Sequence, residues 1–243
     1  MKFPPILLGL LLLLVLGCIV LGLFYQGILR LNYPSTSNYP IQGIDVSHHQ
    51  KDINWEQVHE QNIQFAFIKA TEGGDFKDRK FMENWKRALA AGIDVGGYHF
   101  FTFCTSGREQ AANFIATVPL NALALPPVID VEFGGNCALT ISEEAVLAEL
   151  DTLQYLLEQK YQKRPIFYVT KAAYQQFLKG RFPAHGIWIR DIYGEPALED
   201  REWLFWQYAN RGNLKGIEGY VDLNVFGGNQ EDYQLLLKEK EID

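Results

Sequence analysis

Short apolar segments, rich in β-branched and aromatic residues, alternate with segments of helical periodicity from Ile41 onward. The strand candidates cover residues 43–46, 65–70, 94–100, 128–132, 166–170, 187–191, 205–208 and 221–225. The helical patterns cover residues 54–61, 78–91, 107–117, 142–160, 171–178 and 229–238. This alternation predicts an α/β fold with a mostly parallel sheet. Eight strands in about 200 residues predict a closed or nearly closed β/α barrel. Helices are scarce among the last three strands, so its second half should be irregular.

The first 25 residues form an apolar segment. No charged residue occurs between positions 3 and 25, and positions 6–24 are nearly all Leu, Val, Ile or Gly. The run exceeds the core of a signal peptide (about 7–15 residues) and reaches the roughly 20 residues that span a bilayer. We therefore predict an uncleaved membrane anchor at 1–25, a linker at 26–40 and one folded domain at 41–243. A cleaved signal peptide, or lipidation at Cys18 after Val15-Leu16-Gly17, is the alternative.

The net charge limits the binding partners of the protein, and its cysteines bear on the compartment in which it acts. A formal net charge of −7 and the lack of a Lys/Arg-rich run argue against a nucleic-acid partner. Cys104 and Cys137 each follow a predicted strand by a few residues, in loops that could be neighbours. In an oxidising compartment they would form a disulfide, and two free thiols are the alternative. A monomer is the default oligomeric state.

Two carboxylates follow the double proline Pro126-Pro127, at Asp130 and Glu132. Side chains two positions apart on a strand point to the same face, so the two acids should project together from one strand end. Like charges side by side disfavour each other's ionisation, which favours a pair with one protonated and one ionised member. Cleavage of a glycosidic bond requires such a pair.

Polar and aromatic residues recur where the other predicted strands end. In β/α barrels the active-site residues lie at these C-terminal strand ends and in the loops that follow them. Carboxylates hold hydroxyl groups and transfer protons, while aromatic faces stack on sugar rings. The residues are Asp45, Glu72, Tyr98, Tyr168, Trp188, Asp191, Trp206, Gln207, Asp222 and Asn224.

Six motifs, in order, resemble those of the glycoside hydrolase family 25 lysozymes, the Chalaropsis-type N-acetylmuramidases. They are Gly43-Ile44-Asp45-Val46-Ser47-His48-His49-Gln50, Ile68-Lys69-Ala70-Thr71-Glu72-Gly73, Gly97-Tyr98-His99-Phe100, Asp130-Val131-Glu132, Trp206-Gln207-Tyr208 and Val221-Asp222-Leu223-Asn224. The resemblance covers about residues 41–228. It implies a flattened, incomplete TIM-like barrel that cleaves the β-1,4 bond between N-acetylmuramic acid and N-acetylglucosamine in peptidoglycan. The domain would then act outside the cytoplasm, tethered to the membrane, or secreted if the N-terminal segment is cleaved.

The resemblance also implies residue roles. Glu132 maps to the general acid, and Asp130 to the acid that assists at the reacting sugar. The resemblance suggests retention, with the acetamido oxygen of the substrate attacking while Asp130 orients it. Inversion is the alternative: a separation of the two carboxyl groups near ~5 Å favours retention, and one of ~6.5–9.5 Å favours inversion. Asp45 and Asp222 map to acids that line the same cleft. The expected substrate-binding residues are Tyr98, Tyr168, Trp188 and Gln207 from the resemblance, with Trp206 and Glu72 from the strand ends.

Arg190 and Asp191 depart from the resemblance, because similar enzymes more often have small or aromatic residues there. Substrate preference beyond the scissile bond is therefore less well defined.

Other functions have less support. His48-His49 suggests a metal, but no third ligand has metal spacing, and adjacent histidines on a strand end would face opposite ways. No G-x-S-x-G motif supports a serine hydrolase. A chitinase-like site would need two further aspartates where Leu125 and Val128 stand. We expect no cofactor and no metal. The remaining alternative is a membrane-tethered peptidoglycan-binding module without catalytic activity.

Overall fold

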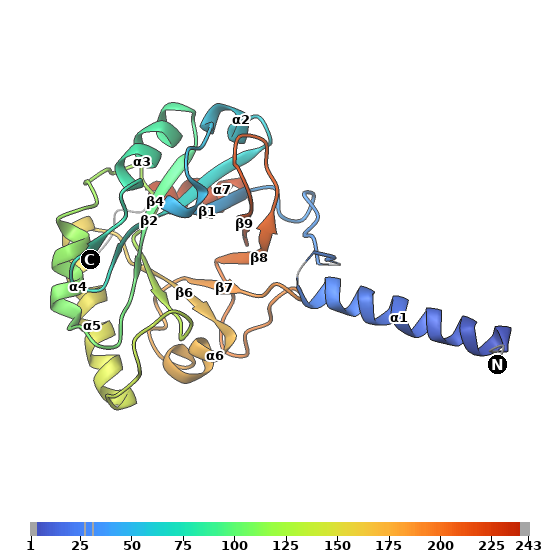
Figure 1. Cartoon of the computed structure of the whole chain (residues 1–243). Coiled ribbons are helices and arrows are strands. Elements are labelled where there is room, and N and C mark those ends of the chain that lie inside the picture. The colour runs from blue at the N-terminus through green and yellow to red at the C-terminus, as the bar shows by residue number, and fades with distance from the viewer. Residues whose placement is uncertain (1–3, 27, 31, 239–243) are drawn as a thin grey trace.

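The strands of the protein close into a barrel (Figure 1), seen in a computed structural model that describes residues 4–26, 28–30 and 32–238. The order around the barrel is β1-β9-β8-β7-β6-β5-β4-β2, and pairing of β1 with β2 completes the ring. The ring is hydrogen-bonded throughout, whereas the resemblance led us to expect an incomplete barrel. The strand bounds are β1 Gln42–Val46, β2 Ile63–Glu72, β3 Phe76–Lys77, β4 Asp94–Phe100, β5 Val128–Val131, β6 Ile166–Thr170, β7 Ile187–Arg190, β8 Phe205–Gly212 and β9 Val221–Phe226.

All eight predicted strands are present, but the direction of the last one was not predicted. β1, β2 and β4 to β8 form parallel pairs around the ring, while β9 is antiparallel to both β1 and β8. The loop between β8 and β9 is too short for a crossover connection, so the chain turns back as a hairpin. The start of β9 therefore lies at the same end of the barrel as the C-terminal ends of the other strands. The additional strand, β3, pairs only with β2.

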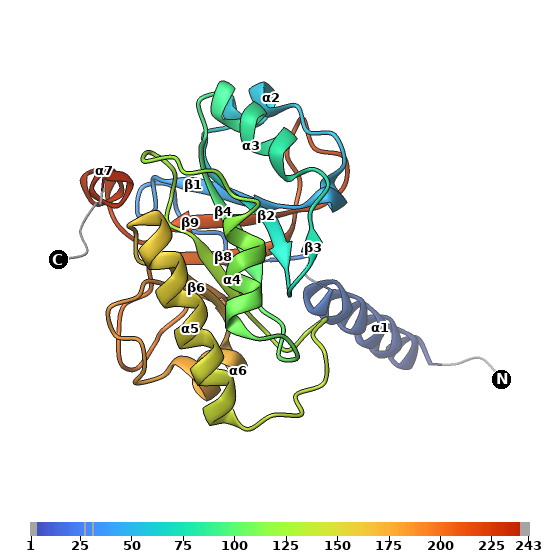
Figure 2. The same cartoon turned by 90° about the vertical axis from the view of Figure 1, so that its left-hand side faces the viewer.

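Helices cover the barrel unevenly, as the sequence predicted. α4 and α5 lie side by side across one side of it (Figure 2), and no helix separates β7, β8 and β9 in residues 187–226. After β6 the chain forms only one short helical turn that continues as a π-helix. The helix bounds are α1 Pro5–Tyr25, α2 Trp55–His59, α3 Phe81–Ala90, α4 Gly107–Ile115, α5 Glu143–Tyr161, α6 Lys171–Ala173 and α7 Gln230–Lys238, with a 3-10 turn at His48–Gln50 and the π-helix at Tyr174–Leu178.

The barrel interior is filled by large aromatic rings. Phe67 of β2 stacks on Trp188 of β7 with ring centroids 4.6 Å apart, and Phe65 contacts Phe205 of β8 at 5.0 Å. These pairs join opposite walls, so the lower part of the barrel is a packed core rather than a channel. Gly43 makes room for this packing, because a Cβ atom there would lie 2.3 Å from the Phe65 ring.

One end of the barrel is closed by α7. Its residues Tyr233, Leu236 and Leu237 pack on the interior aromatic cluster, and Tyr233 OH donates to Asp94 Oδ2, at the start of β4, at 3.1 Å. The N-terminal ends of the parallel strands are thus covered. The opposite end, where the parallel strands end, is not covered by α7.

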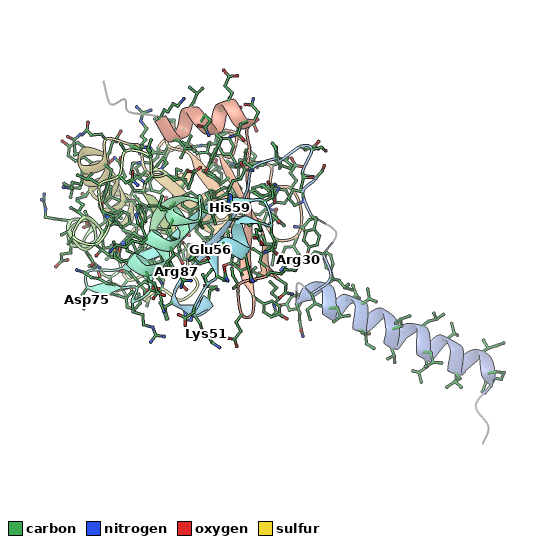
Figure 3. The ribbon with its side chains drawn as sticks, turned by 90° about the horizontal axis from the view of Figure 1, so that it is seen from above. Arg30, Lys51, Glu56, His59, Asp75 and Arg87 are labelled. Carbon is green, nitrogen blue, oxygen red and sulfur yellow. A yellow bond between two sulfur atoms is a disulfide. The ribbon has the colours of Figure 1, made fainter. Side chains whose placement is uncertain are left out.

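The N-terminal helix α1 projects away from the barrel, and its side chains point outward on all sides (Figures 1 and 3). It is long and apolar enough to cross a membrane, judged by length and composition alone. The described part of the following segment contacts β8: Arg30 donates to the Tyr208 carbonyl at 3.1 Å and to Asn210 Oδ1 at 2.7 Å. Asn32 donates to the same carbonyl at 3.1 Å. The segment after α1 is therefore bound to the domain rather than free of it.

Candidate active site

A cavity of about 110 Å³ lies at the open end of the barrel. Eight side chains line it, and all of them are residues that the sequence predicted for the site. Each of these residues lies on a strand or directly follows one, and none is adjacent to another of the eight in the sequence. They are Asp45, Tyr98, Asp130, Glu132, Tyr168, Trp188, Gln207 and Asp222.

Strand alternation and the direction of β9 bring these residues together. Asp130 and Glu132 are two positions apart and both face the cavity, the one within β5 and the other just after it. Asp222 is the second residue of antiparallel β9 and is paired in register with Asp45, the fourth residue of β1. Had β9 been parallel, Asp222 would lie at the closed end of the barrel.

Asp45 accepts a converging set of hydrogen bonds from strands β8 and β9. Gln207 Nε2 and Asn224 Nδ2 each donate to Asp45 Oδ2 at 2.8 Å. The Trp188 indole can only donate, and it donates to Asn224 Oδ1 at 2.8 Å, which turns the Asn224 amide nitrogen towards Asp45. Tyr168 OH fixes Gln207 in the same way, by donating to Gln207 Oε1 at 3.0 Å. The aromatic wall thus orients both donors that hold Asp45.

Asp222 is the protonated partner of Asp45. Burial, the negative charge of Asp45 and a hydrogen bond with Asp45 together raise the pKa of Asp222 well above its ordinary value. Burial also raises the pKa of Asp45, but the hydrogen bonds from Asn224 and Gln207 oppose that rise. Donors stabilise the ionised form of a carboxyl group, so we assign the negative charge to Asp45 and the proton to Asp222.

Asp130 and Glu132 form a second coupled pair. Burial raises the pKa of Asp130 well above its ordinary value, and the charge of Glu132 adds to the effect. The Asp130 side chain is almost completely buried, and its Oδ1 has no hydrogen-bond partner among the described residues. Burial raises the pKa of Glu132 as well, while the charge of Arg190 opposes the rise. The pair therefore retains a proton at a pH where exposed carboxyl groups have lost theirs.

Glu72 lies beside this cavity rather than in its wall. It accepts a hydrogen bond from Lys69 Nζ at 2.7 Å. The same ammonium lies 5.1 Å from the Phe100 ring centroid. Lys69 lowers the pKa of Asp130, and Glu72 raises it. Glu72 therefore affects the pKa of Asp130 in two ways: through its own charge and by holding Lys69 in position.

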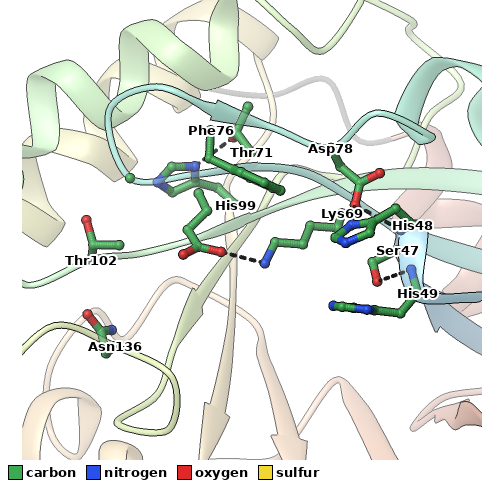
Figure 4. A network of polar contacts seen from close by, with 12 residues as sticks. Ser47, His48, His49, Lys69, Thr71, Phe76, Asp78, His99, Thr102 and Asn136 are labelled. Carbon is green, nitrogen blue, oxygen red and sulfur yellow. Dashed lines mark hydrogen bonds and ion pairs between the residues drawn. The ribbon is translucent and has the colours of Figure 1, made fainter.

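The two histidines after β1 do not form a metal site with other residues. His48 Nδ1 is hydrogen-bonded with buried Asp78 Oδ2 at 2.7 Å, and the His48 and His49 ring centroids are 4.1 Å apart (Figure 4). The expectation that the rings would face opposite ways was wrong, because they lie on a 3-10 turn and not on a strand. In the described ranges, no three His, Cys, Asp or Glu side chains are arranged to hold a metal ion.

Trp206 was predicted at the sugar site, but the structure places it elsewhere. It precedes Gln207 on β8 and therefore points to the opposite face of the strand, where it packs in the outer core and donates to the Asp191 carbonyl at 2.8 Å. Asp191 is also buried, and its carboxylate binds the loop after β7 through the Tyr193 backbone N–H at 3.0 Å.

Asn224 and Lys69 contribute to the site, although neither was among the predicted site residues. Asn224 was noted at its strand end but not included, although it lies two positions after Asp222 and so shares its face. Lys69 continues the inward alternation of Phe65 and Phe67. The period of two in each strand was the signal that could have identified both residues.

The loops after β4 and β5 are tied together next to Glu132. Cys104 and Cys137 form a disulfide with Cα atoms 6.3 Å apart. Asn136 donates to the carbonyls of Phe101 at 2.8 Å and Glu132 at 3.0 Å. Covalent and hydrogen-bonded links thus restrict the backbone that carries Glu132.

Comparison with known proteins gives consistent matches over the barrel. The model of the family described as "Glycosyl hydrolases family 25" matches residues 44–217. The chain is 35% identical over 204 residues to the uncharacterized protein YegX of Escherichia coli, covering 82% of this chain and 74% of that protein. It is 31% identical over 201 residues to lysozyme M1 of Streptomyces globisporus, covering 78% of this chain and 68% of that protein.

Solved structures show the same similarity. A family 25 glycosyl hydrolase from Bacillus anthracis has a TM-score of 0.78 and 44% sequence identity, covering 84% of this chain and 96% of that one. The bacterial lysozyme from Streptomyces coelicolor has a TM-score of 0.76 and 29% identity, covering 83% of this chain and 98% of that one.

Proposed function

Because the chain belongs to glycosyl hydrolases family 25, we propose that it is a lysozyme that cleaves the β-1,4 bond between N-acetylmuramic acid and N-acetylglucosamine in peptidoglycan. The observation that carries this proposal is the convergence of four carboxyl groups with aromatic side chains in one cavity at the open end of the barrel. A binding module without catalysis would not need two coupled acid pairs in its cleft.

The first acid pair performs the bond cleavage. Glu132 donates its proton to the leaving glycosidic oxygen as the bond from that oxygen to the anomeric carbon breaks. Water then supplies the hydroxyl group that bonds to the anomeric carbon, and its other proton returns to Glu132. Burial raises the pKa of Glu132, which favours the protonated form that a general acid needs. Asp130 lies on the same face of β5 and stabilises the positive charge that develops on the sugar ring.

The second acid pair positions the substrate. Asp45 and Asp222 present one acceptor and one donor to sugar hydroxyl or amide groups at the cavity. Trp188 and Tyr98 provide apolar surface for the sugar rings, and Tyr168 and Gln207 keep Asp45 in place. Because these groups are already held by hydrogen bonds, little reorganisation is needed when the saccharide binds.

We propose that α1 is a membrane anchor and that the domain acts outside the cytoplasm as a monomer. Support comes from the length and apolar composition of α1 and from the Cys104–Cys137 disulfide, since disulfides persist in oxidising compartments. Mass analysis of the mature protein recovered from the membrane fraction tests the anchor. A cleaved signal peptide or a lipidated Cys18 would give a different N-terminus.

Replacement of Glu132 by glutamine tests the proposed chemistry. Glutamine preserves the shape but cannot donate the proton, so hydrolysis of purified walls should fall by about 10²–10⁴-fold while the folded structure is kept. Glu56→Gln, at an exposed position of α2, is the matched control and should retain activity (Figure 3). Turbidity loss measures the rate, and reducing-end analysis identifies the new terminal sugar. Near-normal digestion by Glu132→Gln would contradict the assignment.

A further inference from the structure

A second cavity, of about 330 Å³, opens where β6 and β7 end. Arg190 lines this cavity and lies two positions after Trp188 on β7, so it points to the same side of that strand as Trp188, which lines the catalytic cavity. The charge of Arg190 lowers the pKa of Glu132, so the guanidinium lies within electrostatic reach of the acid. The lining residues are Thr170, Lys171, Ala172, Arg190, Asp191, Ile192 and Tyr193.

The guanidinium of Arg190 has no hydrogen-bond or ion-pair partner among the residues that the structure describes. Asp191, the carboxylate beside it, is already occupied. Its Oδ2 pairs with Lys171 Nζ at 2.5 Å, and its Oδ1 accepts the backbone N–H groups of Tyr193 and Gly194 at 3.0 and 3.3 Å. Two cations and one carboxylate line this cavity, and Arg190 has no hydrogen-bonded carboxylate there. Its charge acts at longer range on three acids of the catalytic cavity, Glu132, Asp45 and Asp222.

The guanidinium of Arg190 is suited to bind a carboxylate group. A guanidinium at a cavity wall can donate two parallel hydrogen bonds to a carboxylate, and it is less strongly hydrated than an ammonium group. The muramic acid residue of peptidoglycan carries a 3-O-lactyl arm that ends in a carboxylate. When a stem peptide is attached, that group becomes an amide and the peptide brings carboxylates of its own.

Resting on the function proposed above, we propose that the cavity between the ends of β6 and β7 is a subsite for a carboxylate on the lactyl arm of the substrate. Arg190 is its specificity-determining residue. The cavity volume is that of a site for a small organic group, and it adjoins the place where the sugar is cleaved. The subsite selects glycans that carry an acidic lactyl arm or stem.

Three matched substrates test this inference and identify the source of the carboxylate. The first is a peptide-free oligosaccharide of alternating N-acetylmuramic acid and N-acetylglucosamine, with free lactyl carboxylates. The second is the same oligosaccharide with those carboxylates converted to neutral methylamides. The third carries stem peptides with free carboxylates. kcat/KM is measured for each at low and high salt and across pH.

The wild-type protein should prefer at least one acidic substrate over the neutral one by about tenfold or more, the range of a charge-assisted hydrogen bond. Arg190→Gln should abolish this preference, and Arg190→Lys should restore part of it through a single point charge. Arg87→Gln on α3, where Arg87 pairs with Glu83, removes the same charge far from the cavity and should keep the preference (Figure 3). Preference for the first substrate identifies the lactyl carboxylate, and preference for only the third identifies the peptide.

A different result would show that Arg190 acts only on Glu132. Loss of the guanidinium would then raise the pKa of Glu132 and move the alkaline limb of the pH profile upward for all three substrates by the same amount. An unchanged substrate ratio in Arg190→Gln overturns the subsite while leaving the muramidase function in place. If the wild-type protein cleaved none of the three substrates, the proposed function itself would fail.

Discussion

Replacing Asp130 by asparagine should make the protein more stable at neutral pH and inactive at the same time. Asp130 is almost completely buried, its Oδ1 has no hydrogen-bond partner among the described residues, and burial raises its pKa, with a further rise whenever Glu132 is ionised. Burying an ionised carboxylate without full pairing destabilises the folded state. Asparagine has the same shape and no charge, so the variant loses this penalty together with the catalytic group.

The size and the pH dependence of the effect follow from this environment. A buried polar group that lacks a partner costs about 1–3 kcal/mol, and a charged one costs more, so we expect a gain of at least about 1–2 kcal/mol at pH 7. In a domain of this size that gain corresponds to a rise of roughly 2–8 °C in Tm. The pKa of Asp130 is raised in the folded state. Between the ordinary and the raised pKa the folded protein binds more protons than the unfolded one, so wild-type stability falls as pH increases.

Urea unfolding of the wild-type protein and of Asp130→Asn between pH 3 and pH 8 measures the difference. The stability gain should be near zero at pH 3, where Asp130 is protonated in both states, and should grow as pH rises. Asp75→Asn at an exposed position is the control and should change stability little at any pH (Figure 3). A variant that is equally or less stable than the wild type at pH 7 would refute the electrostatic reasoning.

Three further outcomes test the packing around the site. Replacing Cys104 and Cys137 by alanine should lower the free energy of unfolding, measured in urea, by about 3–4 kcal/mol, because the disulfide closes a loop with a sequence separation of 33. Reductant should destabilise the wild-type protein by the same amount and should not affect the double variant. Trp188→Phe should lower kcat/KM by about tenfold, since Asn224 loses the donor that orients it, whereas Trp206→Phe should leave KM for the oligosaccharide close to that of the wild type. Gly43→Ala should cost about 1–3 kcal/mol in urea unfolding, because its Cβ atom would overlap an interior ring; an unchanged midpoint would show that the ring can move away.

Local sequence patterns predicted most of the elements. β4 and β6 have the predicted bounds, because each is a short β-rich run with clear ends. The predicted strand at 205–208 was too short: β8 continues to Gly212 through Ala209, Asn210 and Arg211, and pairing with β9 outweighs their weak preference for strands. β3 was not predicted, since a two-residue strand gives no periodic signal.

The sequence predicted which residues line the cavity better than it predicted their hydrogen-bond partners. The period of two placed Asp130 and Glu132 on one face, and both line the cavity. The same period, applied to β8, would have separated Trp206 from Gln207. The partner of His48 is Asp78, which is 30 positions away in a segment that meets His48 only after folding, so no local pattern could assign it.

The amino-acid sequence by itself determined the alternation of strands and helices, the apolar N-terminal segment and the acidic residues at the strand ends, because each depends on neighbours within a few positions. The tertiary structure decided the direction of β9, which brought Asp222 beside Asp45 and so raised the pKa of Asp222. It also decided which acids are buried and where the charge of Arg190 acts. These properties depend on distance and burial between segments far apart in the chain, and such quantities exist only once the barrel has closed.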